Sequence, residues 1–161
     1  MIVRNGCPAL PLRFDRQDEG EGGVTLKQAI GLYGCTLGVM LALDIMWLGV
    51  IARDFYQAQI GPLLLDRPAL LPAAAFYLLY GAGIVIFAVS PAVGDGAPTT
   101  ALLYGALFGL IAYATYDLTN LATLRGFPVA FAVVDIAWGS AVTAVSAWSG
   151  YVLARYLGVV G

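Results

Sequence analysis

The stretch TTALLYGALFGLIAYATYDLTNLATL, residues 99–124, contains a single charged side chain, that of Asp117. An α-helix needs about 20 predominantly apolar residues to cross the roughly 30 Å hydrocarbon core of a bilayer. A helix on the surface of a soluble protein would need a polar face, and this stretch does not supply one. It therefore predicts a transmembrane helix.

Three further apolar stretches have the same character, and turn residues separate them. Pro68 suits the first turn of a helix, Ser90-Pro91 suits the end of one, and the segment 125–128 is typical of a tight reversal. We therefore expect an all-α protein, a bundle of four transmembrane helices in which residues 24–161 form one domain. The expected spans are about 26–52, 68–90, 99–124 and 128–157.

The composition agrees with a membrane protein. The 161 residues are 60% hydrophobic and 11% charged, whereas globular domains are about 45–50% apolar and about 25% charged. The chain has no His, which excludes Ser-His-Asp triads and zinc or haem held through imidazole. A net charge of −2 without a basic cluster excludes nucleic acid as a partner and leaves the lipid bilayer as the expected one.

Residues 1–23 differ from the rest of the chain, because they carry seven of its eighteen charged side chains. They lack helical periodicity and an apolar signal region, so we expect a disordered tail and no signal peptide. Two interpretations stay open. The tail is a flexible cytosolic segment, or it is not translated in the natural protein. In the second case purine-rich codons for residues 19–23 resemble a ribosome-binding site, and Val24 is the start.

The basic residues bear on orientation, because an even number of spans places both termini on one side of the membrane. Arg53, Arg67 and Arg125 lie in the loops on one side. Lys27, Arg155 and the tail arginines lie on the other. The positive-inside rule then favours cytoplasmic termini, by a small difference in count.

Three carboxyl groups fall inside the expected spans, where a charged side chain is costly and is a functional candidate by default. Asp44 lies nine residues before Arg53. Asp117 lies eight residues before Arg125, and Asp135 lies ten after it. At about 1.5 Å per residue these separations are roughly 14, 12 and 15 Å. We therefore expect the three acids at one depth, in the leaflet next to these arginines.

Helical spacing brings polar and aromatic side chains to the faces of the acids. Trp47 and Trp138 each follow an aspartate by three residues. Tyr113 and Asn120 lie one turn to either side of Asp117, which is expected to have the most polar surroundings. The expected polar cluster consists of Asp44, Trp47, Tyr77, Tyr80, Tyr113, Tyr116, Asp117, Asn120, Asp135 and Trp138.

Small residues recur four apart on two spans. Gly34 with Gly38, and Gly105 with Gly109, form faces along which helices can approach closely. We expect both pairs to serve helix packing.

Four segments together resemble a known family. They are LDIMWLG at 43–49, FYLLY at 76–80, AYATYDLTNL at 112–121 and DIAWG at 135–139. Over about residues 26–150 the chain is similar to the DUF2177 membrane proteins. The resemblance implies a small bacterial four-span protein, and hence the inner membrane. It carries over no catalytic residues, and the segment before Val24 lies outside it.

Three roles remain open for the cluster. In the first it is structural, since a buried acid tends to stay neutral and to hydrogen-bond across helices. In the second, which we expect, it binds or transports a small ligand or cation, because carboxyl groups and aromatic walls suit organic cations. A homodimer would widen such a path.

In the third role the protein is a lipid-modifying enzyme. The aspartates would act as acid and base or as ligands of Mg²⁺ or Ca²⁺, and residues 55–65 would form an interfacial lid. The sequence has no nucleotide-binding loop and no nucleophile elbow, which disfavours an enzyme. It identifies no cofactor and no metal site.

Overall fold

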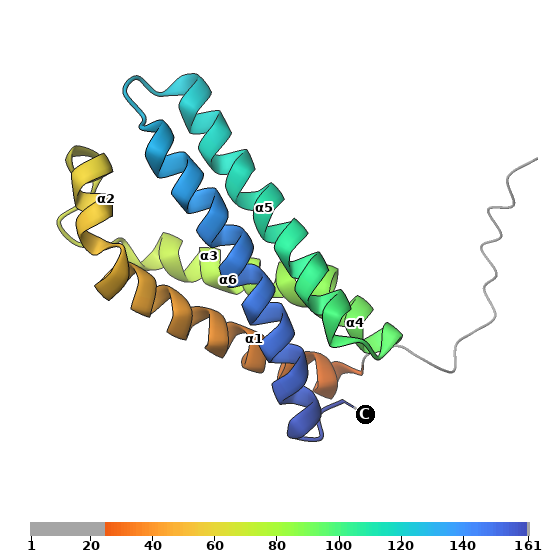
Figure 1. Ribbon diagram of the computed structural model, residues 1–161. Helices are drawn as coiled ribbons and strands as arrows, with labels where there is room; N and C mark the ends of the chain where they lie inside the picture. Colours follow the sequence, from red (N-terminus) through yellow and green to blue (C-terminus); the bar gives the residue numbers. More distant parts are fainter. Residues whose placement is uncertain (1–24, 161) are drawn as a thin grey trace, which may run out of the picture.

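A computed structural model describes residues 25–160 (Figure 1). No strand occurs in this range, so the all-α prediction is confirmed. The tail predicted for residues 1–23 lies outside the described residues. In chain order the elements are α1 (Leu26–Met46), a π-helical segment (Trp47–Ile51), α2 (Arg53–Ile60), a 3-10 turn (Gly61–Leu63), α3 (Leu70–Ile84), a second π-helical segment (Val85–Val89), α4 (Ser90–Asp95), α5 (Pro98–Thr123) and α6 (Val129–Tyr156).

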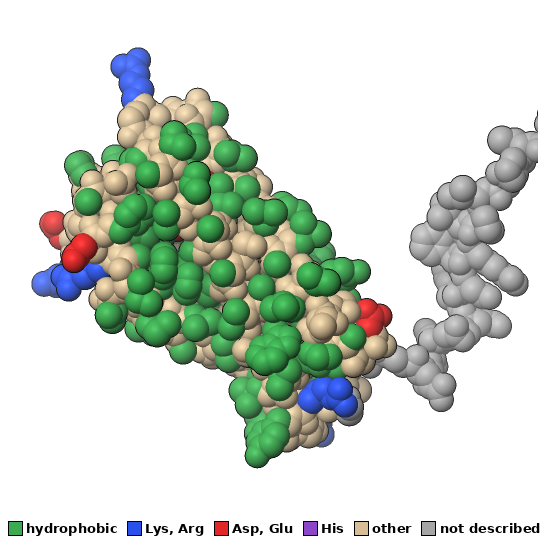
Figure 2. All heavy atoms as spheres, viewed as in Figure 1, with side chains coloured by type: hydrophobic (Ala, Val, Ile, Leu, Met, Phe, Trp, Pro, Cys, Tyr) green, Lys and Arg blue, Asp and Glu red, His purple; other side chains and the backbone are tan. Residues whose placement is uncertain are grey.

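Four helical rods are long and apolar enough to cross a membrane. Figure 2 shows hydrophobic side chains over most of one face of the molecule, with charged side chains near its ends. Soluble monomers rarely expose continuous apolar surface on this scale. The chain is therefore a membrane protein with four candidate spans. The spans are Leu26–Ile51, Leu70–Asp95, Pro98–Thr123 and Val129–Tyr156.

The second span is longer than the sequence suggested, because it does not end at Ser90-Pro91. Proline ordinarily clashes with the carbonyl group four residues earlier in a helix. Here the π-helical segment Val85–Val89 precedes it, and the Ser90 N–H bonds the carbonyl group of Val85 five residues back. The wider π-helical turn accommodates the Pro91 ring. The second span therefore continues to Gly96, whose φ of +65° ends α4.

The helices pack tightly at one end of the molecule and separate toward the other (Figure 1). α5 and α6 form an antiparallel pair, and α1 packs on α6. The second span contacts α5 mainly through Val85–Val89 and α4, and α3 diverges from α5. The molecule therefore has a closed half, which contains α4, the start of α1 and the end of α6, and an open half next to α2.

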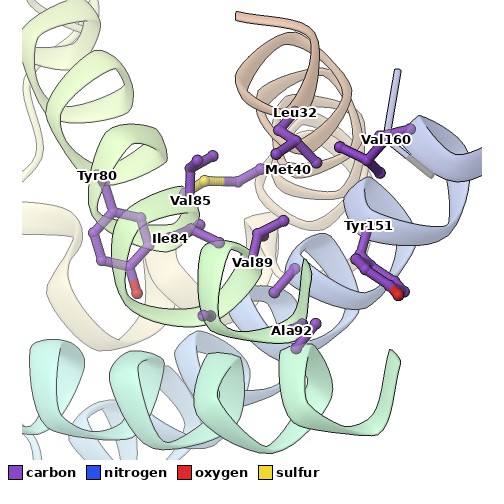
Figure 3. Close-up of a cluster of buried hydrophobic side chains, with 13 residues drawn as sticks. Leu32, Met40, Tyr80, Ile84, Val85, Val89, Ala92, Tyr151 and Val160 are labelled. Atoms are coloured by element: carbon purple, nitrogen blue, oxygen red, sulfur yellow. The ribbon is translucent and has the colours of Figure 1, made fainter. Parts of the chain in front are cut away.

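The hydrophobic core fills the closed half (Figure 3). Leu32 and Met40 of α1 meet Ile84 and Val89 of the second span and Tyr151 of α6, and all five are fully or almost fully buried. Side chains from three spans thus interlock there, which makes the closed half the rigid part of the bundle.

Gly105 and Gly109 allow α5 to approach α6 closely, which confirms the prediction for this pair. A Cβ atom at Gly105 would lie 2.9 Å from the carbonyl oxygen of Thr143. One at Gly109 would overlap the carbonyl oxygen of Gly139. The two backbones approach too closely for any side chain there.

For Gly34 and Gly38 the packing prediction is wrong within this chain. Both are exposed, and a Cβ atom at either would meet nothing within 4 Å among residues 25–160. The reason is the rotation of α1, which turns Leu32, Thr36 and Met40 toward the core and leaves the glycine face outside.

We predict that Gly109→Ala lowers the free energy of unfolding by about 1–3 kcal/mol, the usual cost of overpacking. The added methyl group would overlap α6, whereas the methyl group of Gly34→Ala enters open space. Thermal unfolding of both variants in one detergent measures the difference. Equal losses in the two variants would contradict this packing.

Candidate functional site

The three aspartates lie in the open half of the molecule. Asp44 is near the end of α1, Asp117 near the end of α5 and Asp135 near the start of α6. Their side chains are 4%, 0% and 8% exposed, respectively. Each acid therefore faces other parts of the protein, and none faces the surrounding hydrocarbon.

Asp44 is held by side chains from two other spans. The indole Nε1 of Trp138 on α6 donates a hydrogen bond to Asp44 Oδ1 at 3.1 Å. The hydroxyl group of Tyr77 on α3 lies beside the same carboxyl group. Sequence spacing assigned Trp138 to Asp135 on its own helix, and the structure corrects this. The contact between α1 and α6 brings the indole of Trp138 within reach of Asp44 instead.

Trp47 takes part through its ring. It stacks on the ring of Trp138 with centroids 4.2 Å apart and planes 5° apart. Its Nε1 atom is buried and has no hydrogen-bond partner in the part of the chain that the structure describes. The stacked pair therefore ties α1 to α6 mainly by apolar contact.

Asp135 is bound by a residue outside the expected cluster. The hydroxyl group of Tyr56 on α2 donates a hydrogen bond to Asp135 Oδ1. Burial and this carboxyl group raise the pKa of Tyr56, so the hydroxyl keeps its proton and remains a donor. Phe131 packs edge-on against the Tyr56 ring with centroids 4.9 Å apart.

The sequence carried only a weak signal for Tyr56. The aromatic pair Phe55-Tyr56 stands in an otherwise polar segment, Arg53–Ile60. This pattern indicated a lid. Tyr56 lies outside the spans, so helical spacing within them could not show which aspartate it contacts. In the structure, α2 covers the acids from the loop side.

Asp117 accepts no hydrogen bond from an N–H or hydroxyl donor among residues 25–160. Both carboxyl oxygens are buried, and the carboxyl group of Asp135 lies within hydrogen-bonding reach of them. The prediction that Tyr113, Tyr116 and Asn120 surround Asp117 with polar partners is therefore wrong. Neither Tyr113 nor Asn120 hydrogen-bonds to it, and Tyr116 is 59% exposed. A short aspartate and a long, rigid tyrosine on one helix face end at different distances from the helix axis.

The tyrosines Tyr80 and Tyr113 form a wall beside the acids. The Tyr80 hydroxyl pairs with Thr143 Oγ1 at 2.8 Å, so it is not bonded to an aspartate. The Tyr113 ring lies over Gly139, where any side chain would overlap it. The two rings meet edge to face with centroids 6.1 Å apart.

A cavity of about 310 Å³ lies against this wall, between α3 and α5. Asp135 is the only aspartate among the residues that line it. The volume lies at the lower end of the range typical of small-molecule sites, about 300–1,000 Å³. The lining residues are Phe76, Tyr80, Ala112, Tyr113, Tyr116 and Asp135.

The acids do not form a metal-binding group. Within residues 25–160 no three acidic, histidine or cysteine side chains come close enough to hold one ion. Asp44 bonds Trp138, and Asp135 bonds Tyr56, so their oxygens turn toward different partners. The three aspartates therefore do not act as ligands of one ion in the part of the chain that the structure describes.

We predict that Asp44→Asn folds with nearly unchanged stability, because the amide oxygen can still accept the Trp138 hydrogen bond. Asp44→Leu should lose about 1–3 kcal/mol, because the buried indole N–H is left unpaired. Thermal unfolding in detergent measures both, with Asp66→Leu in the exposed loop as the control. Wild-type stability of Asp44→Leu would refute the role given to this bond.

A second prediction concerns the hydrogen bond between Tyr56 on α2 and Asp135. Tyr56→Phe keeps the ring against Phe131 but removes the donor to Asp135, which should lower the free energy of unfolding by about 1–3 kcal/mol. Tyr156→Phe, at the exposed end of α6, is the matched control and should unfold like the wild type. If the two variants unfold alike, α2 is not held by this hydrogen bond.

Comparison with known proteins agrees with the segments quoted from the sequence. A family model described as a predicted membrane protein, DUF2177, matches residues 29–152. Neither the comparison with curated proteins nor the comparison with solved structures gave a match. The matched range includes every residue of the polar cluster. The chain therefore belongs to the DUF2177 family of predicted membrane proteins.

Proposed function

We propose that this protein binds a small organic cation in the cavity beside Asp135, within the membrane. One observation carries the proposal: four aromatic side chains and one carboxyl group line the same cavity. Aromatic faces attract quaternary ammonium and other organic cations, and the attraction grows when water is excluded. The carboxyl group of Asp135 supplies the opposite charge.

The neighbouring acid supports a positive ligand. Asp117 is fully buried, its oxygens are unpaired among residues 25–160, and it lies next to Asp135. Two neighbouring carboxyl groups far from water repel each other when both are ionised. A cation at Asp135 reduces this repulsion, and a neutral or anionic ligand does not.

Access from the bilayer follows from the divergence of α3 and α5. The cavity lies between these two helices, and the second span contacts α5 mainly through Val85–Val89 and α4, at the closed half. On the loop side, α2 covers the acids through Tyr56. A ligand that partitions into the membrane therefore has a shorter route to Asp135 than one that enters from the loops.

We further propose that both termini face the cytoplasm of a bacterial inner membrane. A Cβ atom at Gly31 would overlap the Val159 side chain, so the start of α1 and the end of the chain lie together. Lys27, Arg155 and the arginines of residues 1–23 favour that side by the positive-inside rule. The acid cluster then belongs to the outer leaflet.

The test uses choline as a compact quaternary ammonium and its uncharged carbon isostere, dimethylbutanol. We predict that choline raises the unfolding temperature of the wild type by mass action and that the isostere does not. Asp135→Asn should bind choline about tenfold or more weakly, because a hydrogen bond or contact to a charged group is worth roughly 1.5–3 kcal/mol.

Asp66→Asn removes an exposed loop carboxyl group and serves as the matched control. It should respond to choline like the wild type. Equal responses of all three proteins, or of the wild type to choline and the isostere, would exclude the cation site. The structural role of the cluster would then be the remaining explanation.

A further inference from the structure

We infer that the ligand is a single-chain amphiphile whose apolar chain lies in a groove between the second span and α5. The inference rests on the proposed function, because it extends the site at Asp135 along the outer surface of the bundle. The groove begins at the cavity and continues toward the closed half.

Two further hollows form the groove. One of about 370 Å³ shares Phe76, Tyr80 and Ala112 with the cavity, so the two are adjacent. The next, of about 220 Å³, shares Phe87 and Phe108 with the first. The three hollows therefore make one path that starts at Asp135.

The path carries a charged side chain at one end only, that of Asp135. No charged residue lines either of the two further hollows, and their only polar side chains are those of Tyr80 at the junction and Tyr104 at the far end. From Tyr116 to Tyr104 the path follows α5 for twelve residues, roughly 18 Å at 1.5 Å per residue. A molecule with one charged head and one long apolar chain matches this distribution.

The groove is wide enough for one hydrocarbon chain but too narrow for an α-helix of another copy. The lining residues of the larger hollow run from Phe76 to Phe87, about 16 Å of helix. A volume of about 370 Å³ over this length leaves a mean cross-section of roughly 23 Å². An α-helix of another copy, about 10 Å across, does not fit, whereas one hydrocarbon chain does.

Stacked aromatic rings line the groove. The Phe108 ring lies between those of Tyr80 and Phe87, with centroids 5.3 and 5.5 Å away. The Phe108 ring packs directly against Gly83, where a Cβ atom would lie 2.8 Å from it, so the ring forms the floor of the groove. A chain in the groove would therefore lie over these rings, which line both further hollows.

The experiment compares choline with octyltrimethylammonium and dodecyltrimethylammonium, titrated into the full-length protein in phosphatidylglycerol nanodiscs. Ala82→Phe places a ring in the groove without touching the cavity, because Ala82 lines only the larger hollow. Ala74→Phe, on the exposed surface of the same helix, is the matched control for added bulk and for partitioning into the bilayer.

We expect the affinity of the wild type and of Ala74→Phe to rise with chain length. Ala82→Phe should bind choline normally but dodecyltrimethylammonium about tenfold or more weakly, since several methylene groups lose their contacts. Ile86→Trp, at the exposed edge of the groove, gives a second blocked variant in case Ala82→Phe does not fold.

The failures of the two proposals are distinguishable. If choline binds through Asp135 but the blocked variants match Ala74→Phe at every chain length, the groove does not hold the chain and the proposed function stands. If no cation binds through Asp135, both proposals fail. If the blocked variants lose choline as well, the hollows are not separable and the inference is overturned.

Discussion

A polar group left without a partner in hydrocarbon costs more than one left in water, and this cost organises the open half of the molecule. The backbone N–H and C=O groups hydrogen-bond within each helix. The cost therefore concerns the polar side chains that interrupt the apolar spans. Asp44 is paired across helices with Trp138, and Asp135 is paired with Tyr56 from outside the spans. The first bond links α1 to α6, and the second links α2 to α6.

Asp117 is the exception to this pairing. It is fully buried with both oxygens unpaired among residues 25–160, and Asp135 is next to it. A buried carboxyl group without a hydrogen-bond donor destabilises the fold, because its desolvation is not compensated. Asp117 lies beside Asp135, the one aspartate that lines the cavity.

The two halves of the bundle use different packing. In the closed half, small residues such as Gly105 and Gly109 bring α5 against α6, and aliphatic side chains fill the space left over. In the open half, large aromatic rings separate the helices and leave the cavity. The second span joins the halves, because its π-helical segment reaches α5 while α3 diverges. The rigid half thereby positions the walls of the site.

The sequence by itself determined the number of spans and, except at the end of the second, roughly their bounds, because hydropathy is a local property. It also showed which side chains share a helix face. Only the tertiary structure decided how each helix is rotated and which neighbour it meets. That step paired Trp138 with Asp44, brought Tyr56 to Asp135, left Asp117 unpaired and turned Gly34 outward. Helical periodicity shows which residues share a face of a helix, but not which neighbouring helix that face contacts. In lipid, several rotations of a helix about its axis bury similar apolar area, and close contacts between helices select one of them.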